Sequence, residues 1–416
     1  MILEKYSLGV GDRFGHEGCA QLQALQLAAD RGTLISPVWN KSYREHSIIG
    51  TQPADARTAA DEAVKKCKWT HPYYVDADHI GLKTVDLFID SSDYYTLDVA
   101  EFIGRAPDAN SVNGFVRSVT GFIGDLKIPG LSTPIKVTEA DVRKVGNKYL
   151  LAIREAGKIY KHIASAKGVD NFVTEISTDE AEESQTPTEL FFILAAVSQE
   201  GIPIQTIAPK FTGQFLKGID YVGAVERFKR EFEDDLCVIE FAVNNFRLPS
   251  NLKLSVHSGS DKFSLYPIIH HSIKKHDAGL HLKTAGTTWL EELIGMAMSG
   301  GKGYAVSQAI YADAHNRIDE LCGPYESVID IDRRKLPDPD KVRNWNKDTF
   351  VAALRHDKSN AGYNIHFRQL LHLSYKVAAE MGEDFTNALD HAREYVAKNV
   401  TQNLFERHVR PLFLDK

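Results

Sequence analysis

Two aspartates and a histidine in the segment VDADHI are the first residues whose types and spacing could do chemistry. Val75 and Ala77 alternate with Asp76 and Asp78, so on a β-strand both carboxylates would face the same way, and His79 follows at the strand end. A carboxylate beside an imidazole suits a divalent metal ion, an acid/base pair, or both. The competing interpretation is a helix N-cap followed by a surface histidine.

A second segment, KLSVHSGSDKFS, predicts a strand that ends at His257 and a helix that starts near Asp261. The small residues between them, which include Ser258, would expose backbone N–H groups that can hold an anion at the helix N-terminus. The segment HLKTAGTTW repeats this pattern after Lys283. In a β/α barrel the loops after the last two strands commonly bind a phosphate, and a sugar carboxylate would fit as well.

Three histidines, His79, His257 and His281, therefore lie at or near predicted strand ends. With Glu175 they could form a mixed nitrogen and oxygen site for zinc, nickel, manganese or iron. Glu175 lies within an apolar run, where a glutamate is costly to bury unless it is paired or bound to a cation. His281 precedes Lys283 by two residues and is equally compatible with a structural histidine deeper in the fold.

The elements that must position these residues alternate between short apolar runs and longer helical patterns, which predicts a parallel sheet with helices outside it. The runs interpreted as strands are 7–13, 34–41, 73–79, 85–90, 172–178, 204–211, 252–257 and 280–283. Their number favours an α/β fold of the TIM (β/α)8 barrel type. The competing fold is a doubly wound open sheet, but no GxGxxG follows the first strand.

We assign residues 1–301 to a catalytic barrel and 302–416 to a helical C-terminal extension. An insertion at 93–137 is longer than a plain loop and is expected to form a lid or small subdomain. The extension is expected to pack on the barrel or to form a subunit interface. In the second case the protein would be a homo-oligomer. The active site of a β/α barrel lies at the rim where the strands end. Charged residues at or near the ends of predicted strands are therefore candidates for that site; they include Asp12, Arg13, Lys41 and Lys210.

Composition excludes several classes of protein. The chain of 416 residues carries 49 Lys and Arg against 56 Asp and Glu, a net charge of −7, which argues against a nucleic-acid binder or an anionic-membrane binder. No apolar run approaches the length of a membrane span, and no signal peptide is expected. The 4 cysteines have no metal-ligand spacing and are typical of reduced thiols in a cytoplasmic protein.

Six segments together resemble the tagaturonate epimerase family. They are GDRFG (11–15), VDADHI (75–80), the Thr-Pro before LFFIL, APKF…KGIDY (208–221), HSGSDKFSLYP (257–267) and HLKTAGTTWLEE (281–292), with a weaker match at NIHFRQLLHLSY (364–375). Enzymes of this family interconvert tagaturonate and fructuronate. The resemblance implies a TIM barrel, a divalent metal cation and an acidic pair that moves protons on a small-molecule ketohexuronate.

The resemblance also implies roles for individual residues. Carried over by position, Asp78 would be the proton acceptor and Glu175 its partner acid, while His79, His257 and, with less support, His281 would bind the metal. We expect the remaining candidates to contact substrate; they are Asp12, Arg13, Lys41, Lys210, Ser258, Asp261 and Lys283.

The reaction that fits these acid/base, metal-binding and substrate-binding candidates is a retro-aldol epimerisation. The carbon that inverts lies one position beyond the neighbour of the ketone, so its C–H bond is not acidified by the carbonyl group. Opening and reclosing the adjacent C–C bond avoids that difficulty, with the metal as Lewis acid. Three alternatives stay open: a tagatose 4-epimerase that acts on the free ketohexose, a metal-dependent ketose aldolase that releases both fragments, and a non-catalytic sugar-binding barrel.

Overall fold

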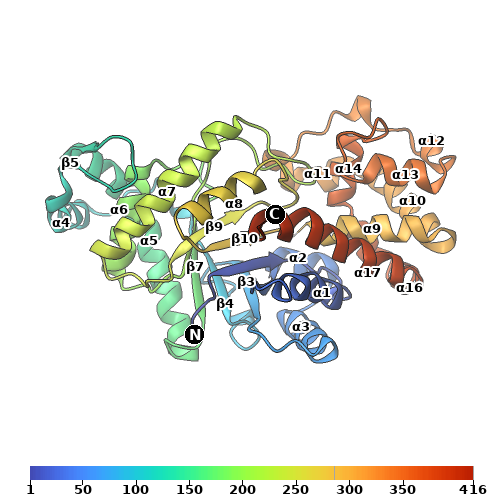
Figure 1. The fold of residues 1–416 in the computed structure, drawn as a ribbon, viewed down its shortest axis with the longest axis horizontal. Coiled ribbons are helices and arrows are strands. Elements are labelled where there is room, and N and C mark those ends of the chain that lie inside the picture. The colour runs from blue at the N-terminus through green and yellow to red at the C-terminus, as the bar shows by residue number, and fades with distance from the viewer. Residues whose placement is uncertain (285, 416) are drawn as a thin grey trace.

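Eight parallel strands close into a barrel in the computed structural model, which describes residues 1–284 and 286–415 (Figure 1). Each strand pairs with the next along the chain, and the last pairs with the first. The strands are β1 (Tyr6–Val10), β2 (Ser36–Ser42), β3 (Tyr74–Ile80), β4 (Tyr94–Asp98), β7 (Val173–Ser177), β8 (Thr206–Ala208), β9 (Lys253–His257) and β10 (Leu280–Lys283). The expected TIM barrel is therefore confirmed, and seven of the eight strands overlap their predicted runs.

The exception is the predicted strand at 85–90, which is wrong. Val85 and Phe88 are buried three residues apart, which is the spacing of a helical turn, and η1 (Val85–Leu87) is a short 3-10 helix. The fourth barrel strand is β4, which lies at the start of the segment 93–137. The rest of that segment holds α4 (Ala109–Ser118), which packs on α5, and a hairpin of β5 (Gly124–Leu126) and β6 (Ile135–Val137).

Helices between the strands form the outer layer of the barrel. They are α1 (Gly18–Ala29), α2 (Tyr43–Ile49), α3 (Pro53–Cys67), α5 (Glu139–Lys167), α6 (Pro187–Glu200), α7 (Val225–Asn245), α8 (Tyr266–Lys275) and α9 (Thr287–Ser299). Local sequence sets their ends. In α6, for example, Thr186 and Glu189 form a capping box, Pro187 occupies the first turn, and Gly201 ends the helix with a φ of 70°.

The C-terminal third of the chain is helical, as expected, and forms a second apolar core beside the barrel (Figure 1). Its helices are α10 (Gly301–Asn316), α11 (Ile318–Cys322), α12 (Pro339–Arg343), α13 (Lys347–Leu354), α14 (Ile365–Leu373), α15 (Tyr375–Glu380), α16 (Glu383–His391), α17 (Arg393–Gln402) and α18 (Arg410–Phe413). α17 packs on α9, where a Cβ at Gly295 would lie 2.5 Å from the Cα of Val396, so only glycine permits this approach.

A buried ion cluster joins this region to the barrel. The carboxylate of Asp261, after β9, accepts hydrogen bonds from Arg368 Nη2 on α14 at 2.7 Å and from Thr287 Oγ1 on α9 at 2.9 Å. His356 and His408 approach the same carboxylate at 3.1 Å and 3.3 Å. The side chains of Asp261 and Arg368 are fully buried, so each charge would be strongly destabilising without the other.

In the described residues no helix is both long and apolar enough to cross a membrane.

We expect Asp261→Ala to lower the free energy of unfolding by about 3–5 kcal/mol, because it leaves the Arg368 guanidinium buried and unpaired. The positive partners, against the opposing effect of burial, hold the pKa of Asp261 well below its usual range, so this stabilisation is present above about pH 4 and is lost as pH falls. Urea denaturation at pH 7.5 measures the effect. Lys5→Ala, which breaks the exposed pair with Asp277, is the control and should cost much less; equal costs for both variants would contradict the prediction.

Candidate active site at the carboxyl ends of the strands

Charged side chains gather where β3, β7 and β10 end, and strand alternation explains why. Asp76 and Asp78 on β3, Glu175 on β7 and Lys283 on β10 all face the barrel axis, since the ammonium of Lys283 contacts all three carboxylates. The neighbouring strand β1 leaves room for the lysine side chain. A Cβ at Gly9 of β1 would lie 2.8 Å from Lys283 Cγ, so the small residue lets the side chain cross the interior.

Lys283 is the centre of this ion cluster. Its Nζ lies 2.8 Å from Asp76 Oδ2, 2.9 Å from Asp78 Oδ1 and 3.1 Å from Glu175 Oε1, and it also donates to Thr96 Oγ1. Burial opposes its charge, but the three carboxylates outweigh that cost and hold the pKa of Lys283 well above its usual range. Burial raises the pKa of Asp76 to about 7 although Lys283 acts to lower it.

A β-bulge turns His79 toward the same site. Ala77 pairs with Tyr95 and Ile80 with Leu97, so β3 contains one residue more than β4 across this step. His79 has a φ of 52°, the left-handed region that a non-glycine residue rarely adopts. Because of this irregularity Asp78 and His79 meet although they are consecutive, with His79 Nδ1 2.8 Å from Asp78 Oδ1.

Asp179 brings the imidazole of His79 together with that of His257. His257 Nδ1 lies 3.0 Å from Asp179 Oδ2, and His79 Nε2 lies 3.6 Å from Asp179 Oδ1. One ligand atom from each residue lies within 4.8 Å of the other two, which is a spacing that could hold a metal ion. We call His79, Asp179 and His257 the His/Asp group.

Each imidazole of the His/Asp group bonds to a further carboxylate through its other nitrogen. Asp78 contacts Nδ1 of His79, and Glu175 Oε1 lies 2.8 Å from Nε2 of His257. Carboxylates on the second ring nitrogen orient a histidine and fix its tautomer. The carboxylates of Asp78 and Glu175 thus connect the ion cluster of Lys283 to the His/Asp group.

Glu175 is buried mid-strand, as expected, and is fully paired. Its Oε2 accepts a hydrogen bond of 2.9 Å from the Tyr94 hydroxyl, while Oε1 contacts His257, Lys283 and Thr96. Burial works against the charged form, yet the positive charges of Lys283 and His257 hold the pKa of Glu175 well below its usual range. The carboxylate is therefore ionised in a fully buried position.

His281 is not brought into the His/Asp group. It lies two residues before Lys283 on β10, so its side chain also faces the interior but one layer deeper. Its Nδ1 bonds to Ser7 Oγ at 2.8 Å and its ring lies 5.3 Å from that of Tyr94. Burial lowers the pKa of His281 to about 3, which keeps the ring neutral.

Ser258 and Asp261, two predicted substrate contacts that follow β9, form hydrogen bonds with other parts of the protein. Ser258 Oγ donates to the backbone oxygen of Lys283 at 2.6 Å and so ties the end of β9 to the end of β10. Asp261 belongs to the buried cluster with Arg368, and it bonds to side chains of α9 and the C-terminal region. The structure therefore does not bring Asp261 to the His/Asp group.

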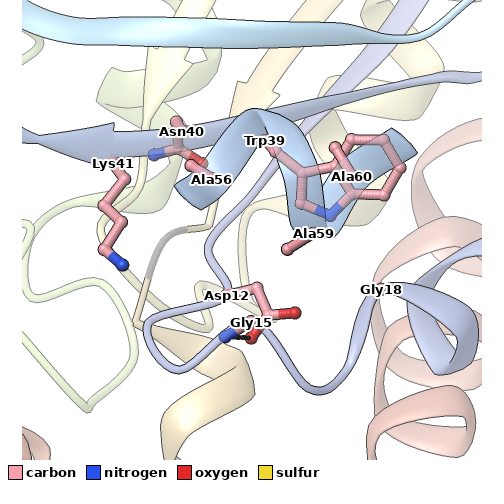
Figure 2. Close-up of a pocket in the computed structure, with 9 residues that line it drawn as sticks. All are labelled: Asp12, Gly15, Gly18, Trp39, Asn40, Lys41, Ala56, Ala59 and Ala60. Carbon is pink, nitrogen blue, oxygen red and sulfur yellow. Dashed lines mark hydrogen bonds between the residues drawn. The ribbon is translucent and has the colours of Figure 1, made fainter. Parts of the chain in front are cut away.

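The predicted substrate contacts on β1 and β2 lie on one side of the mouth. Asp12 accepts hydrogen bonds from the backbone N–H groups of Gly15 and Glu17 at 2.9 Å and 2.8 Å and so shapes the turn, while Lys41 Nζ donates to the Arg13 oxygen at 2.7 Å. Figure 2 shows a small pocket between these residues and α3. The pocket is lined by Asp12, Gly15, Gly18, Trp39, Asn40, Lys41, Ala56, Ala59 and Ala60.

Lys210 lies after β8 on the far side of the mouth from β2. Its Nζ donates to the backbone oxygen of Ala181, and its backbone N–H donates to Gln185 Oε1 at 2.6 Å. These bonds connect it to the loop that carries Asp179.

Sequence reasoning missed Asp179 and the part that Asp76 plays in the ion cluster. Asp179 lies two residues beyond β7, in the acidic run STDEAEE, where neighbouring acids looked like a solvated patch. Its position directly after a strand with a buried glutamate was the signal that could have distinguished it. Strand alternation predicted that Asp76 and Asp78 face the same way. Their common partner Lys283, however, lies 205 residues beyond Asp78 in the sequence.

Comparison with known proteins gives one consistent result. The model of the family described as tagaturonate epimerase matches residues 1–412. The tagaturonate/fructuronate epimerase of Thermotoga maritima is 27% identical over 420 residues, which cover 97% of this chain and 80% of that protein.

Solved structures of fructuronate-tagaturonate epimerase from Cohnella laeviribosi share the fold. A structure complexed with one glycerol superimposes with a TM-score of 0.79 at 24% identity, covering 98% of this chain and 81% of that one. The native structure of the same enzyme gives a TM-score of 0.79 at 23% identity, again covering 98% and 81% of the two chains.

Replacing Lys283 by methionine should destabilise the fold by about 3–5 kcal/mol at pH 8, because three carboxylates then face one another in the interior without a counter-charge. The cost should shrink at pH 5.5, since carboxyl groups with raised pKa values take up protons there. Thermal unfolding of variant and wild type at both pH values measures this difference. A loss that is the same at both pH values would show that the lysine contributes packing rather than charge.

Proposed function

We propose that this chain, which belongs to the tagaturonate epimerase family, interconverts D-tagaturonate and D-fructuronate with the help of a divalent cation. As a member of an epimerase family the chain is an isomerase. The observation that carries the metal proposal is the His/Asp group, in which two imidazoles and a carboxylate converge beside buried acids.

The donor set fits a divalent cation. Two histidines and one carboxylate suit zinc, nickel, manganese or iron and leave coordination positions for a substrate. Charge supports the same assignment, because Asp76, Asp78, Glu175 and Asp179 are buried or half-buried while Lys283 is the ammonium that contacts three of them. In this proposal Asp179, rather than His281, completes the ligand set.

When bound, the cation would supply Lewis acidity toward a ketone oxygen. We assign the proton transfers to Asp78 and Glu175, which are held by Lys283 on one side and by the two imidazoles on the other. Asp78 would take the proton from the hydroxyl on the carbon that inverts. The electron pair of the adjacent C–C bond then forms a C–C double bond in one fragment, an enediolate, and the other fragment becomes an aldehyde.

Rotation of the aldehyde presents its opposite face before the C–C bond forms again. The re-formed alkoxide takes a proton back, so no atom is gained or lost and the product is the epimer. Glu175, which starts ionised, would take up a proton from the hydroxyl group on the enediolate side and return it as the C–C bond re-forms, while Tyr94 and His257 hold its carboxylate in place. Retention of both fragments in the site distinguishes this epimerase from an aldolase.

Metal dependence is tested by proton NMR of metal-stripped protein with D-tagaturonate, before and after addition of nickel, zinc or manganese. D-fructuronate should appear only after addition. Conversion of D-tagatose but not of D-tagaturonate would move the substrate to the free ketohexose, and three-carbon products would indicate an aldolase. Full activity of the stripped protein would contradict the metal proposal.

The ligand assignment predicts that His257→Ala and Asp179→Ala bind less than a tenth of the wild-type metal content, measured by mass spectrometry of dialysed protein. His391→Ala is the matched control, since His391 is exposed and its ring bonds to the backbone of its own helix. Metal content equal to that of the control in either ligand variant would remove that residue from the set.

The acid/base assignment predicts that Asp78→Asn and Glu175→Gln lower turnover by about 10²–10⁴-fold at saturating metal. Glu182→Gln, an exposed acid in the neighbouring loop, is the control and should retain activity. Recovery of turnover at high metal concentration would show that the carboxylates only orient the imidazoles. The reaction in deuterated water should place no deuterium on the inverted carbon; incorporation there would indicate direct deprotonation instead.

A further inference from the structure

Two tyrosines of the C-terminal region lie at the mouth of the barrel, where cationic side chains from the barrel loops contact their rings. Tyr325 in η4 (Gly323–Val328) and Tyr375 at the start of α15 are buried, and their hydroxyls share a hydrogen bond of 2.8 Å. The guanidinium of Arg13, from the β1 loop, lies 4.3 Å from the centre of the Tyr375 ring. Lys217 and Arg44 lie 5.4 Å and 4.9 Å from the centre of the Tyr325 ring.

Positive charge exceeds negative charge around this tyrosine pair. Within the described ranges, Glu45 is the single carboxylate that forms an ion pair with any of the three cations, at 3.1 Å from Arg13 Nη2. Glu45 also accepts from Arg13 Nε at 3.1 Å, so one side of the guanidinium is occupied. Lys217 and Arg44 keep two positive charges without a paired carboxylate.

Buried polar atoms beside these cations also lack partners. Arg13 is 7% exposed, and its Nη1 forms no hydrogen bond with any described residue. The same holds for both ring nitrogens of His372 on α14, a residue that is 1% exposed. Such groups are costly to bury unless a ligand completes their hydrogen bonds.

Lys217 is held in position by backbone hydrogen bonds to the C-terminal region. Its backbone N–H donates to the Val328 oxygen at 2.8 Å, and Gln369 Nε2 donates to its backbone oxygen at 3.1 Å. Burial lowers the pKa of Lys217, as do Arg13 and Arg44, while Glu45 and Asp78 raise it.

His372 packs between the residue that follows Lys217 and the loop after β10, since a Cβ at Gly218 would lie 3.3 Å from its Cβ. A Cβ at Gly286 would lie 2.0 Å from Cε1 of His372, so the ring rests on the backbone of the loop after β10. Burial lowers its pKa well below the usual range, and the charges of Arg13 and Lys217 lower it further. A neutral imidazole can donate one hydrogen bond to an anion between these cations without adding charge.

We infer that Arg13 and Lys217 bind the carboxylate of the substrate, with His372 as a neutral donor and the tyrosine pair as the wall behind the cations. This inference rests on the proposed function and adds the determinant of substrate class. A six-carbon acid would place its ketone end at the His/Asp group and its carboxylate at this cation cluster. The cluster therefore selects a ketohexuronate over an uncharged ketohexose.

Lys217→Gln is the test variant, because Lys217 is half-buried and forms no ion pair with a described residue. Calorimetry should show D-tagaturonate binding weakened by about 10–100-fold, and kcat/KM for D-tagaturonate should fall mainly through KM. Binding and turnover of D-tagatose should change by less than about threefold. Lys65→Gln, an exposed lysine on α3, is the matched control and should behave as wild type.

Arg13→Lys is the second variant, since it keeps the charge opposite Glu45 but removes the forked guanidinium. It should also weaken D-tagaturonate binding more than D-tagatose binding. Equal losses for both sugars in Lys217→Gln, or unchanged D-tagaturonate binding, would overturn the carboxylate site. Faster turnover of a ketohexose 6-phosphate than of D-tagaturonate would overturn it in favour of a phosphate.

Binding and turnover separate this inference from the proposed function. If the wild type binds D-tagaturonate without converting it and Lys217→Gln loses that binding, the carboxylate site stands and the proposed function fails. If the wild type neither binds nor converts D-tagaturonate with any metal, both are overturned.

Discussion

The ammonium of Lys283 lies among three carboxylates from two other strands, Asp76 and Asp78 on β3 and Glu175 on β7. In an interior that excludes water each of these charges is tolerable only because the others are present. The contact therefore ties the inward faces of β3, β7 and β10 together across the barrel. Two of the oxygens that contact the lysine, Asp78 Oδ1 and Glu175 Oε1, also bond to His79 and His257, so the same atoms hold the ammonium and the imidazoles.

The carboxylates of Asp78 and Glu175 orient the two histidines of the candidate site. Asp78 bonds to His79 and Glu175 bonds to His257, so the acids that surround the lysine also set the direction of the imidazoles. The β-bulge at His79 is what allows Asp78 and His79 to serve one site, because consecutive strand residues otherwise face opposite sides. Its left-handed backbone is tolerable where the surrounding ion cluster and the pairing with β4 hold it.

The C-terminal helices are part of the barrel's mouth as well as a second core. Asp261, buried against Arg368, fastens the loop after β9 to α14. The same helix carries His372, and the next contributes Tyr375, which contacts Arg13 of the β1 loop. Residues separated by most of the chain thus lie together at the mouth of the barrel, so the same helices stabilise the joint and carry the side chains that we propose recognise the substrate.

The sequence by itself determined the barrel, because strand and helix periodicity are local properties. It also indicated Asp78, His79, Glu175 and His257 as candidates that would lie close together, because polar residues at strand ends are visible in a linear pattern. It did not separate the true fourth strand, β4, from the turn at 85–90, since both contain buried apolar residues over a short range. Tertiary structure decided the rest. Whether His281 or Asp179 joins the two histidines depends on depth along the barrel axis, and the partners of Lys283, Arg13 and Asp261 come from distant strands and helices. Such pairings follow from how the chain closes on itself, which no local spacing encodes.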